Sequence, residues 1–367
     1  MEEVNVEEKK AQASIFDQIS TLEHEQLVFC HDEYTGLKAL IGIHNTVLGP
    51  ALGGTRMWSY ASDQEAVTDV LRLSRGMTYK AAISGLNIGG GKAVIIGDVH
   101  KLKSEALMRR FGRFIESLGG RYVTAEDVNM STRDMEYISM ETKHVTGLPE
   151  TMGGGGDPSP VTAYGVYMGM KAILKNETGS ESLENKKVAV QGAGQVGSYL
   201  VELLTKEGAE VFVSDIYKEK LDRLVTHHKV TVVNPEEIHK LDVDVYAPCA
   251  LGATLNDQTI PELRCNVVAG GANNQLFDEN IHARMLKDKG IIYGPDFLIN
   301  AGGVMNVYAE YLGGYNRQVV YQLAENIYRT CQKIINMANS EGITTHEAAK
   351  KLAEKRINDL GKVKLAF

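Results

Sequence analysis

One short segment limits the possible folds of this chain more than any other. The apolar run 187–191 is followed at once by 192–197, whose glycines have the spacing G-x-G-x-x-G. A second apolar run, 210–214, leads directly into Asp215. A strand, a glycine turn that opens a helix, and a second strand form the first unit of a parallel, doubly wound sheet. The segment therefore predicts an α/β protein that contains a Rossmann domain.

The glycines of this turn have separate roles if the turn binds a dinucleotide. Gly192 permits the tight turn, Gly194 allows the backbone to approach a pyrophosphate, and Gly197 lets the helix pack on the strand. Asp215 would bind ribose hydroxyls and repel a 2′-phosphate, which favours NAD over NADP. The alternative is a glycine-rich turn in another doubly wound sheet. The predicted cofactor contacts are Gly192, Ala193, Gly194, Gln195, Val196, Gly197 and Asp215.

Strands and helices are expected to alternate from residue 187 onward. The expected strands are 187–191, 210–214, 243–246, 266–269 and 291–292, and the expected helices are 195–206, 217–227, 235–240, 279–288, 317–340 and 345–360. Before residue 187 we expect strands at 26–30, 37–44, 93–96 and 121–128, a short helix within 1–24 after a charged lead-in, and helices near 63–79, 103–118, from 131 and at 161–176.

The segment 147–160 is rich in Gly and Pro and marks a change of composition. We therefore expect two domains with a cleft between them. Residues 1–147 would form a domain for substrate binding, catalysis and oligomerisation, and 148–341 would form the NAD-binding domain. The last helix, within 342–367, is expected to return to the first domain.

Composition excludes several classes of protein. The 367-residue chain has a formal net charge of −8, which argues against nucleic-acid binding. Its four cysteines form no CxxC pair, and its histidines show no metal spacing, so we expect no metal site. We find no apolar run long enough to cross a membrane and no signal peptide. These features predict a cytoplasmic enzyme or binding protein.

Three residues of the first domain are candidates for chemistry. Lys92 follows glycines 89–91 and opens an apolar run, so desolvation would lower its pKa and suit it to acid–base work. Lys80 could bind a substrate carboxylate and, if close, lower the pKa of Lys92 further. Asp127 ends a predicted strand and could exchange a proton with an amine. Each residue also has a structural alternative. Lys92 could lie on a simple surface turn, Lys80 could be a solvated charge at a helix C-terminus, and Asp127 could be an acid at the start of a helix.

The chain resembles the amino-acid dehydrogenase superfamily of glutamate, leucine, phenylalanine and valine dehydrogenases, and most closely the leucine dehydrogenases. The resemblance covers nearly the whole chain from Leu27. It is carried by the motifs at 49–57, 76–80, 85–92, 124–128, 159–166, 272–275 and 300–304. It implies that Lys92 is the catalytic base, that Lys80 binds the α-carboxylate and that Asp127 acts on the amine.

The resemblance also implies further contacts. Asn274 would lie near substrate and the nicotinamide ribose, Thr162 near the nicotinamide amide, and Cys249 and Ala250 beside the cofactor. Side-chain specificity is implied at positions that are aliphatic here, which favours leucine, valine and isoleucine. The implied substrate contacts are Leu52, Gly53, Met77, Ala125, Val304 and Val307.

The implied activity is reversible, NAD-dependent oxidative deamination of branched-chain L-amino acids to 2-oxo acids and ammonia by a homo-oligomer, often an octamer. The rivals are a phenylalanine or valine dehydrogenase of the same family, a non-catalytic NAD-sensing protein, and an NAD-dependent hydroxy-acid dehydrogenase. Retention of Lys92 and Asp127 argues against the NAD-sensing protein. A hydroxy-acid dehydrogenase would need a catalytic His–acid pair near the nicotinamide, and we see no candidate motif for one. Two features depart from the common pattern, namely residues 129–130 and the glycine run 153–156.

Overall fold

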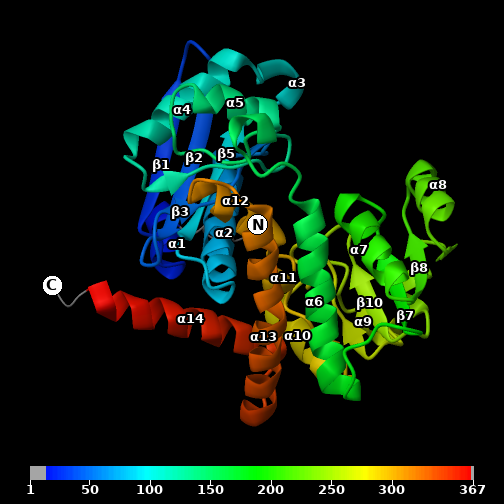
Figure 1. Cartoon of the computed structure of the whole chain (residues 1–367). Helices are drawn as coiled ribbons and strands as arrows, with labels where there is room; N and C mark the ends of the chain where they lie inside the picture. The colour runs from blue at the N-terminus through cyan, green and yellow to red at the C-terminus, as the bar shows by residue number, and fades with distance from the viewer. Residues whose placement is uncertain (1–13, 365–367) are drawn as a thin grey trace, which may run out of the picture.

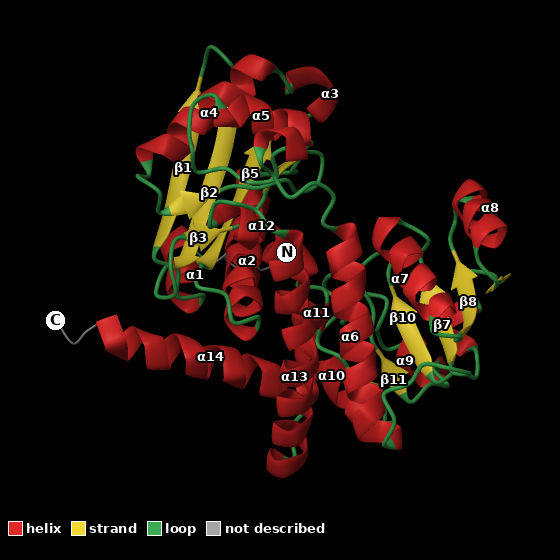
Figure 2. Ribbon diagram, in the orientation of Figure 1, coloured by secondary structure: helices red, strands yellow, loops and turns green. Residues whose placement is uncertain are grey.

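A computed structural model describes residues 14–364 and shows an α/β protein with two six-stranded sheets (Figures 1 and 2). The charged lead-in at 1–13 and the last three residues lie outside the described range. The first sheet contains β1 (Gln26–Asp32), β2 (Leu37–Asn45), β3 (Ala51–Leu52), β4 (Thr55–Trp58), β5 (Gly89–Ile96) and β6 (Tyr122–Val123). The second contains β7 (Lys187–Gln191), β8 (Glu210–Ser214), β9 (Val230–Val232), β10 (Val245–Pro248), β11 (Val267–Val268) and β12 (Ile292–Tyr293).

The helices surround these sheets. Those of the first half are α1 (Ile15–Thr21), α2 (Asp63–Ile83), α3 (Val99–Leu102), α4 (Glu105–Ser117) and α5 (Thr132–Ser139). The others are α6 (Ser159–Thr178), α7 (Gln195–Lys206), α8 (Lys218–His227), α9 (Thr259–Glu262), α10 (Glu279–Asp288), α11 (Asp296–Ile299), α12 (Gly302–Tyr311), α13 (Arg317–Glu341) and α14 (Thr345–Lys364). Short 3₁₀ turns lie at Glu150–Met152 and Ile238–Lys240.

The second sheet is parallel throughout, in the order β12-β11-β10-β7-β8-β9. This confirms the Rossmann-type α/β fold expected from the glycine turn after β7. The strand β9 was not expected, because 230–232 has no clear alternation and lies at the sheet edge. The helix expected at 235–240 was wrong in extent, because only the 3₁₀ turn Ile238–Lys240 forms there.

The first sheet is mixed. Its strand order is β1-β2-β5-β3-β6, β4 also pairs with β5, and the β1–β2 and β2–β5 pairs are antiparallel. The glycines 89–91 lie within β5 rather than in a turn before it, because β2 and β3 pair with them on both sides. The strand expected at 121–128 shrinks to Tyr122–Val123, and β3 and β4 were too short to predict.

The helix α2 is the element that positions chemistry in the first domain. Ser62 caps its N-terminus by accepting a hydrogen bond from the Glu65 amide, and its buried face includes Val70 and Leu71. A Cβ on Gly90 would lie 2.1 Å from the Thr78 Oγ1, so only glycine lets α2 approach β5 this closely. The last turn of α2 is thereby pressed against the strand that carries Lys92.

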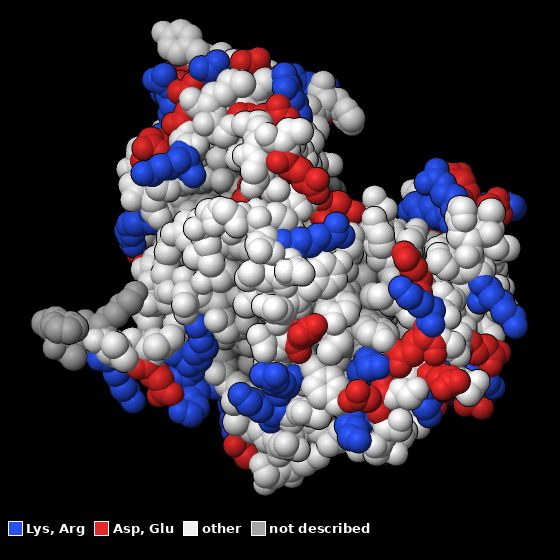
Figure 3. Space-filling model, viewed as in Figure 1, with Lys and Arg blue, Asp and Glu red and all other residues white. Residues whose placement is uncertain are grey.

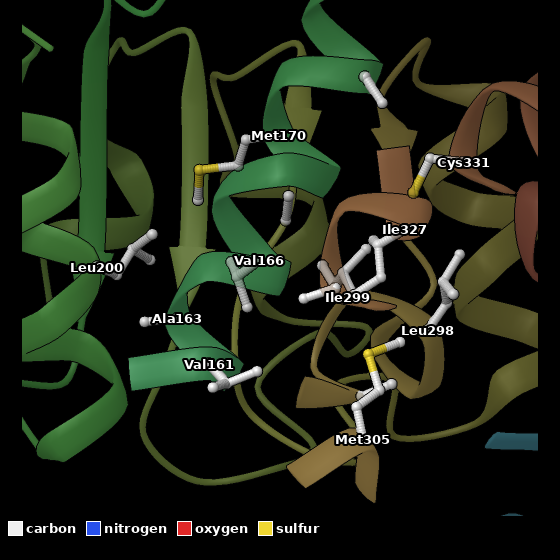
Figure 4. Packing of buried hydrophobic residues seen from close by; sticks show 14 of the residues in the cluster. Val161, Ala163, Val166, Met170, Leu200, Leu298, Ile299, Met305, Ile327 and Cys331 are labelled. Carbon is white, nitrogen blue, oxygen red and sulfur yellow. The ribbon is translucent and has the colours of Figure 1, made fainter. Parts of the chain in front are cut away.

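The core of the second domain is built around α6 (Figure 4). Helix α7 contributes Leu200 on one side of α6, while α11 and α13 contribute Ile299 and Ile327 on the other, and all three side chains are buried. The same cluster of buried residues continues through α14 into the end of α2. Figure 1 shows α14 running from α13 toward the first sheet and passing beneath α2, and the Tyr79 hydroxyl of α2 bonds the Glu354 carboxylate of α14 at 3.0 Å. The division at residue 147 itself stays a prediction.

Candidate active site

A lysine and an aspartate from distant parts of the first sheet form an ion pair. Lys92 lies in the middle of β5, and Asp127 follows β6. The Lys92 Nζ is 3.0 Å from an Asp127 carboxylate oxygen, and only 9% of the lysine side chain is exposed. Burial lowers the pKa of Lys92 although Asp127 favours its charged form. A lysine with a lowered pKa gives up its proton more readily than a solvated one, which suits Lys92 to acid–base chemistry.

Arg56 and Asp69 extend this pair into a network that the sequence did not reveal. The Arg56 Nε donates to the same Asp127 oxygen at 2.8 Å, and Arg56 Nη1 donates to Asp69 at 3.0 Å. The Tyr60 hydroxyl donates to Asp69 at 2.7 Å. Burial opposes ionisation of Asp127, but Lys92 and Arg56 outweigh it and hold the pKa of its carboxyl below the usual value. The motif 49–57 contains Arg56, yet nothing in its spacing indicates this partner.

Lys80 lies near the C-terminus of α2 and reaches the second domain. Its half-buried Nζ donates to the Asn273 Oδ1 at 3.2 Å. Loss of hydration lowers the pKa of Lys80 to about 8, against the opposing charge of buried Asp296, and the Lys92 charge lowers it further. Because repulsion between two like charges is mutual, the expected effect of Lys80 on Lys92 holds, and the Arg56 charge lowers the pKa of Lys92 as well.

Asn273 links Lys80 to a rigid loop of the second domain. Its Oδ1 also accepts a hydrogen bond from the Asn300 Nδ2 at 2.8 Å. The buried Gln275 holds the same loop by donating to the carbonyls of Gly270 and Ala272. The next residue, Asn274, is exposed and has a left-handed backbone with φ of 50°. Asn273 is therefore the residue of the 272–275 motif that contacts Lys80, and the sequence did not single it out.

Four of the six implied substrate contacts are buried apolar residues or glycine. Leu52 ends β3 beside β5, and Ala125 follows β6, both buried. Gly53 accepts a hydrogen bond from the Tyr122 hydroxyl at 2.6 Å. Val304, buried on α12, belongs to the same buried cluster as Leu52. Met77 on α2 and Val307 on α12 are partly buried against that cluster.

The glycine turn of the second domain fits a bound dinucleotide. A Cβ on Gly197 would lie 2.0 Å from the Gly192 carbonyl oxygen, so α7 packs on this turn only because residue 197 is glycine. By contrast, no atom lies within 4 Å of a Cβ built on Gly194. The turn therefore has no room for a side chain at Gly197, whereas it is open at Gly194, the position expected to face a pyrophosphate. Gln195 and Val196 open α7.

Asp215 ends β8 and is tied to this turn. One of its carboxylate oxygens accepts the Ala193 amide at 2.7 Å, and the other accepts the Tyr217 amide at 2.9 Å. Two N–H groups hold the carboxylate at the end of the strand, where lone pairs remain for ribose hydroxyls. The sequence predicted the residue but not its bond to the turn.

Of the remaining implied cofactor residues, two lie against the glycine turn and one lies against α12. Cys249 and Ala250 follow β10 and lie against Gly192. The Gly271 amide donates to the Cys249 sulfur at 3.3 Å, and burial raises the pKa of the thiol to about 11, which makes it an inert packing group. Thr162 is buried in the first turn of α6 and donates to the Pro158 carbonyl.

The linker between the two sheets is held by one carboxylate. Glu310 on α12 accepts hydrogen bonds from the backbone amides of Gly147, Leu148 and Gly155, each at 3.1 Å. These amides lie at the two ends of the linker segment 147–155. Helix α12 also carries Val304 and Val307, so the helix that binds the linker also carries two of the implied specificity residues.

Two observations concern the molecule as a whole. Positive and negative side chains are interspersed on the face in Figure 3, with no extended field of one sign. Among the helices that the structure describes, none has the length and apolar character needed to span a bilayer.

The geometry and the comparisons together define an amino-acid dehydrogenase. A family model described as "Glu/Leu/Phe/Val dehydrogenase, dimerisation domain" matches residues 24–144. A second, described as "Glutamate/Leucine/Phenylalanine/Valine dehydrogenase", matches 153–217 and 213–364. The chain belongs to this family, as its sequence motifs predicted, and its fold is the two-domain α/β fold of that family.

Several relatives share most of the chain. A leucine dehydrogenase from Thermoactinomyces intermedius is 53% identical over 96% of both chains. A phenylalanine dehydrogenase from Bacillus thermotolerans is 47% identical over 95% of this chain and 92% of its own. The crystal structure of an L-tryptophan dehydrogenase from Nostoc punctiforme superposes with a TM-score of 0.85, at 45% identity, over 95% of this chain and 99% of that chain.

Proposed function

We propose that this amino-acid dehydrogenase oxidatively deaminates branched-chain L-amino acids with NAD. The observation that carries the proposal is the Lys92–Asp127 pair, 3.0 Å apart, whose charges both act on the nearby Lys80 at the end of α2. Such a set contains a cation for a carboxylate and two groups that exchange protons with an amine and with water. The similarity to leucine dehydrogenases supports the same reading.

In the proposed mechanism, the Lys80 ammonium binds the substrate α-carboxylate, and Asp127 accepts a proton from the substrate ammonium. NAD, when bound, supplies the nicotinamide carbon that takes up the hydride from the substrate Cα. Lys92, whose pKa burial lowers, then removes a proton from water as the water attacks the imine carbon. Collapse of the carbinolamine releases ammonia and the 2-oxo acid.

Closure of the crevice would exclude water until the imine has formed. The hydrogen bond between Lys80 and Asn273 supports this step, because it joins α2 of the first domain to the 272–275 loop of the second at 3.2 Å. A substrate carboxylate held by Lys80 would lie beside the same loop, which also carries Asn274.

The glycine turn would hold the pyrophosphate of NAD, and Asp215 would bind the adenosine ribose. Thr162, Cys249 and Ala250 are proposed to line the rest of the dinucleotide site. NAD is favoured over NADP because a carboxylate at the end of β8 would lie close to a 2′-phosphate and repel it.

Branched-chain substrates are favoured because the proposed specificity residues Leu52, Ala125, Val304 and Val307 are aliphatic, with Gly53 and Met77 beside them. None of these side chains carries a cation for the side-chain carboxylate of glutamate. The relatives include phenylalanine and tryptophan dehydrogenases, so an aromatic substrate is the competing possibility.

The deciding experiment measures NADH absorbance with leucine, valine, isoleucine, phenylalanine, tryptophan and glutamate, each with NAD and with NADP. The proposal expects the highest kcat/KM for one of the three branched-chain substrates with NAD. A preference for phenylalanine or tryptophan would overturn the substrate assignment, while activity on none of the six would overturn the proposed function.

We further propose a cytoplasmic homo-oligomer, an octamer built through the first domain. The description of the first family model as a dimerisation domain supports assembly through residues 24–144. Light scattering of the purified protein tests the number of chains, and a mass of one chain would contradict it.

A further inference from the structure

The turn between the two lysines has an unusual partner. Helix α2 ends at Ile83, three residues beyond Lys80, and β5 begins at Gly89, three residues before Lys92. The segment 84–88 is therefore the direct chain connection between the two elements that carry the lysines. Two hydrogen bonds within the turn, from the Gly85 amide to Ala82 and from the Leu86 amide to Ala81, close the end of the helix.

These bonds use the carbonyls of Ala81 and Ala82, whereas the Gly85 and Leu86 carbonyls lie just beyond the end of the helix and still need donors. The C-terminus of a helix also carries the negative end of its dipole, which favours a cation there. Arg356, on α14, supplies the donors from the other end of the chain. Its guanidinium nitrogens donate to the carbonyls of Leu86 at 2.7 Å, Gly85 at 3.2 Å and Ala82 at 3.4 Å, and to the Asn87 Oδ1 at 2.8 Å.

Arg356 is half-buried, and none of its hydrogen-bond partners in the described part of the chain is a carboxylate. Burial lowers the pKa of its guanidinium, because the charge has lost part of its hydration in this position. A surface arginine is normally paired with a carboxylate or hydrated by water. Among the described contacts, all hydrogen-bond partners of Arg356 come from one six-residue stretch, 82–87, so the arginine is placed to fix the shape of that stretch.

The position of Arg356 is itself fixed by packing. Ala353 and Ala349, one and two turns earlier on α14, are fully buried in the cluster that contains Ala81 and Ala82 of α2. Figure 1 shows α14 crossing beneath α2 as a single long helix. The guanidinium therefore reaches the turn from a rigid support that belongs to the segment after the Rossmann sheet.

We propose that Arg356 is a positioning residue that sets the separation of Lys80 and Lys92 by holding the turn between them. The role of that separation in turnover rests on the proposed function, whereas the holding of the turn does not. Arg356 touches neither lysine, so it acts through backbone geometry. The C-terminal helix thereby controls the catalytic half of the molecule.

The test compares Arg356→Gln and Arg356→Lys with Lys355→Gln. Lys355 is the exposed neighbour on α14 and bonds only Asp359 among the contacts described, so its variant removes a positive charge from the same helix turn and leaves 82–87 untouched. Peptide-resolved hydrogen exchange of 81–91 and steady-state kinetics are measured for all three, after correction for the folded fraction.

For Arg356→Gln we expect amide exchange in 84–91 to rise about tenfold or more, since at least two charge-assisted hydrogen bonds are lost. We also expect kcat to fall about tenfold and KM for the amino acid to rise, with KM for NAD unchanged. Arg356→Lys should recover part of both effects, because an ammonium still donates to two or three carbonyls. Lys355→Gln should match the wild type.

Normal exchange in 84–91 of Arg356→Gln would overturn the proposal, as would faster exchange with unchanged kcat and KM for the amino acid. A purely stabilising role would lower the melting temperature without separating the KM values for amino acid and NAD. If the wild-type protein oxidises no amino acid, the proposed function fails, while the exchange rates still decide whether Arg356 holds the turn.

Discussion

The two halves of the candidate site are built by opposite means. In the second domain, the dinucleotide turn is a contiguous stretch, 192–197, whose shape depends on backbone and on the absence of side chains. In the first domain, Lys92 is held by side chains from separate segments, because Lys92 and Arg56 both contact the same carboxylate oxygen of Asp127. The glycine turn tolerates little increase in side-chain size, whereas the Lys92 site depends on the balance of charges. Substitutions should therefore affect the two halves in different ways.

The largest effect is expected at Lys92. Lys92→Ala removes the only buried amine paired with Asp127 among the described contacts, so kcat should fall about a thousandfold or more. NAD binding, measured by fluorescence titration, should stay unchanged because the turn 192–197 is untouched. Lys38→Ala, an exposed lysine on the neighbouring strand β2, is the control. A kcat within tenfold of the wild type would contradict the role of Lys92.

A smaller loss is expected at Arg56. Arg56→Gln removes a charged hydrogen bond to Asp127, so kcat should fall about thirtyfold. The arginine also helps to hold the pKa of the Asp127 carboxyl low, so its loss should move the acidic limb of the kcat/KM profile to higher pH. Arg72→Gln is a matched control, because Arg72 pairs with Asp69 at 3.7 Å and is largely exposed. An acidic limb that stays in place would show that Arg56 does not tune Asp127.

The dinucleotide half is tested through Asp215. Asp215→Ser should raise KM for NAD about tenfold and reduce the discrimination against NADP, because a charged acceptor for the ribose is lost. KM for the amino acid should change little. Asp222→Ser, on the exposed side of α8, is the control. Unchanged preference for NAD would remove this explanation of cofactor choice.

The smallest effect concerns acid stability and should fall on the first domain. Under α2, His24 and His44 lie with ring centroids 4.7 Å apart. Burial lowers their pKa values to about 4 and about 3, so the unfolded chain binds more protons than the folded one below pH 6.5. Stability is therefore complete above that value and is lost as pH falls toward 4, by about 0.7 kcal/mol per histidine between pH 7 and 6.

Urea unfolding followed between pH 7 and 5 measures this slope. His44→Gln should flatten it, because glutamine keeps a donor and an acceptor for Thr78 and the Leu22 carbonyl but binds no proton. The exposed His100→Gln should leave the slope as it is. Equal slopes in all three proteins would contradict the role of the buried pair.

The contrast between the halves also explains what the sequence could predict. The parallel sheet, the glycine turn and Asp215 follow from local spacing, because a β-α-β unit places neighbours in sequence beside one another in space. Lys80, Lys92 and Asp127 were identified by position and by family resemblance. Their partners Arg56, Asp69 and Asn273 were not, since each contact joins segments whose separation only the fold determines. The short strands β3 and β4 were missed for the same reason.

Glu310 has a mechanical consequence for the whole molecule. Its carboxylate gathers three amides from both ends of the linker at 3.1 Å, so linker and α12 are pinned together at a single point. The same carboxylate therefore couples the backbone of the linker to the helix that carries Val304 and Val307. A substitution at Glu310 would release both ends of the linker at once.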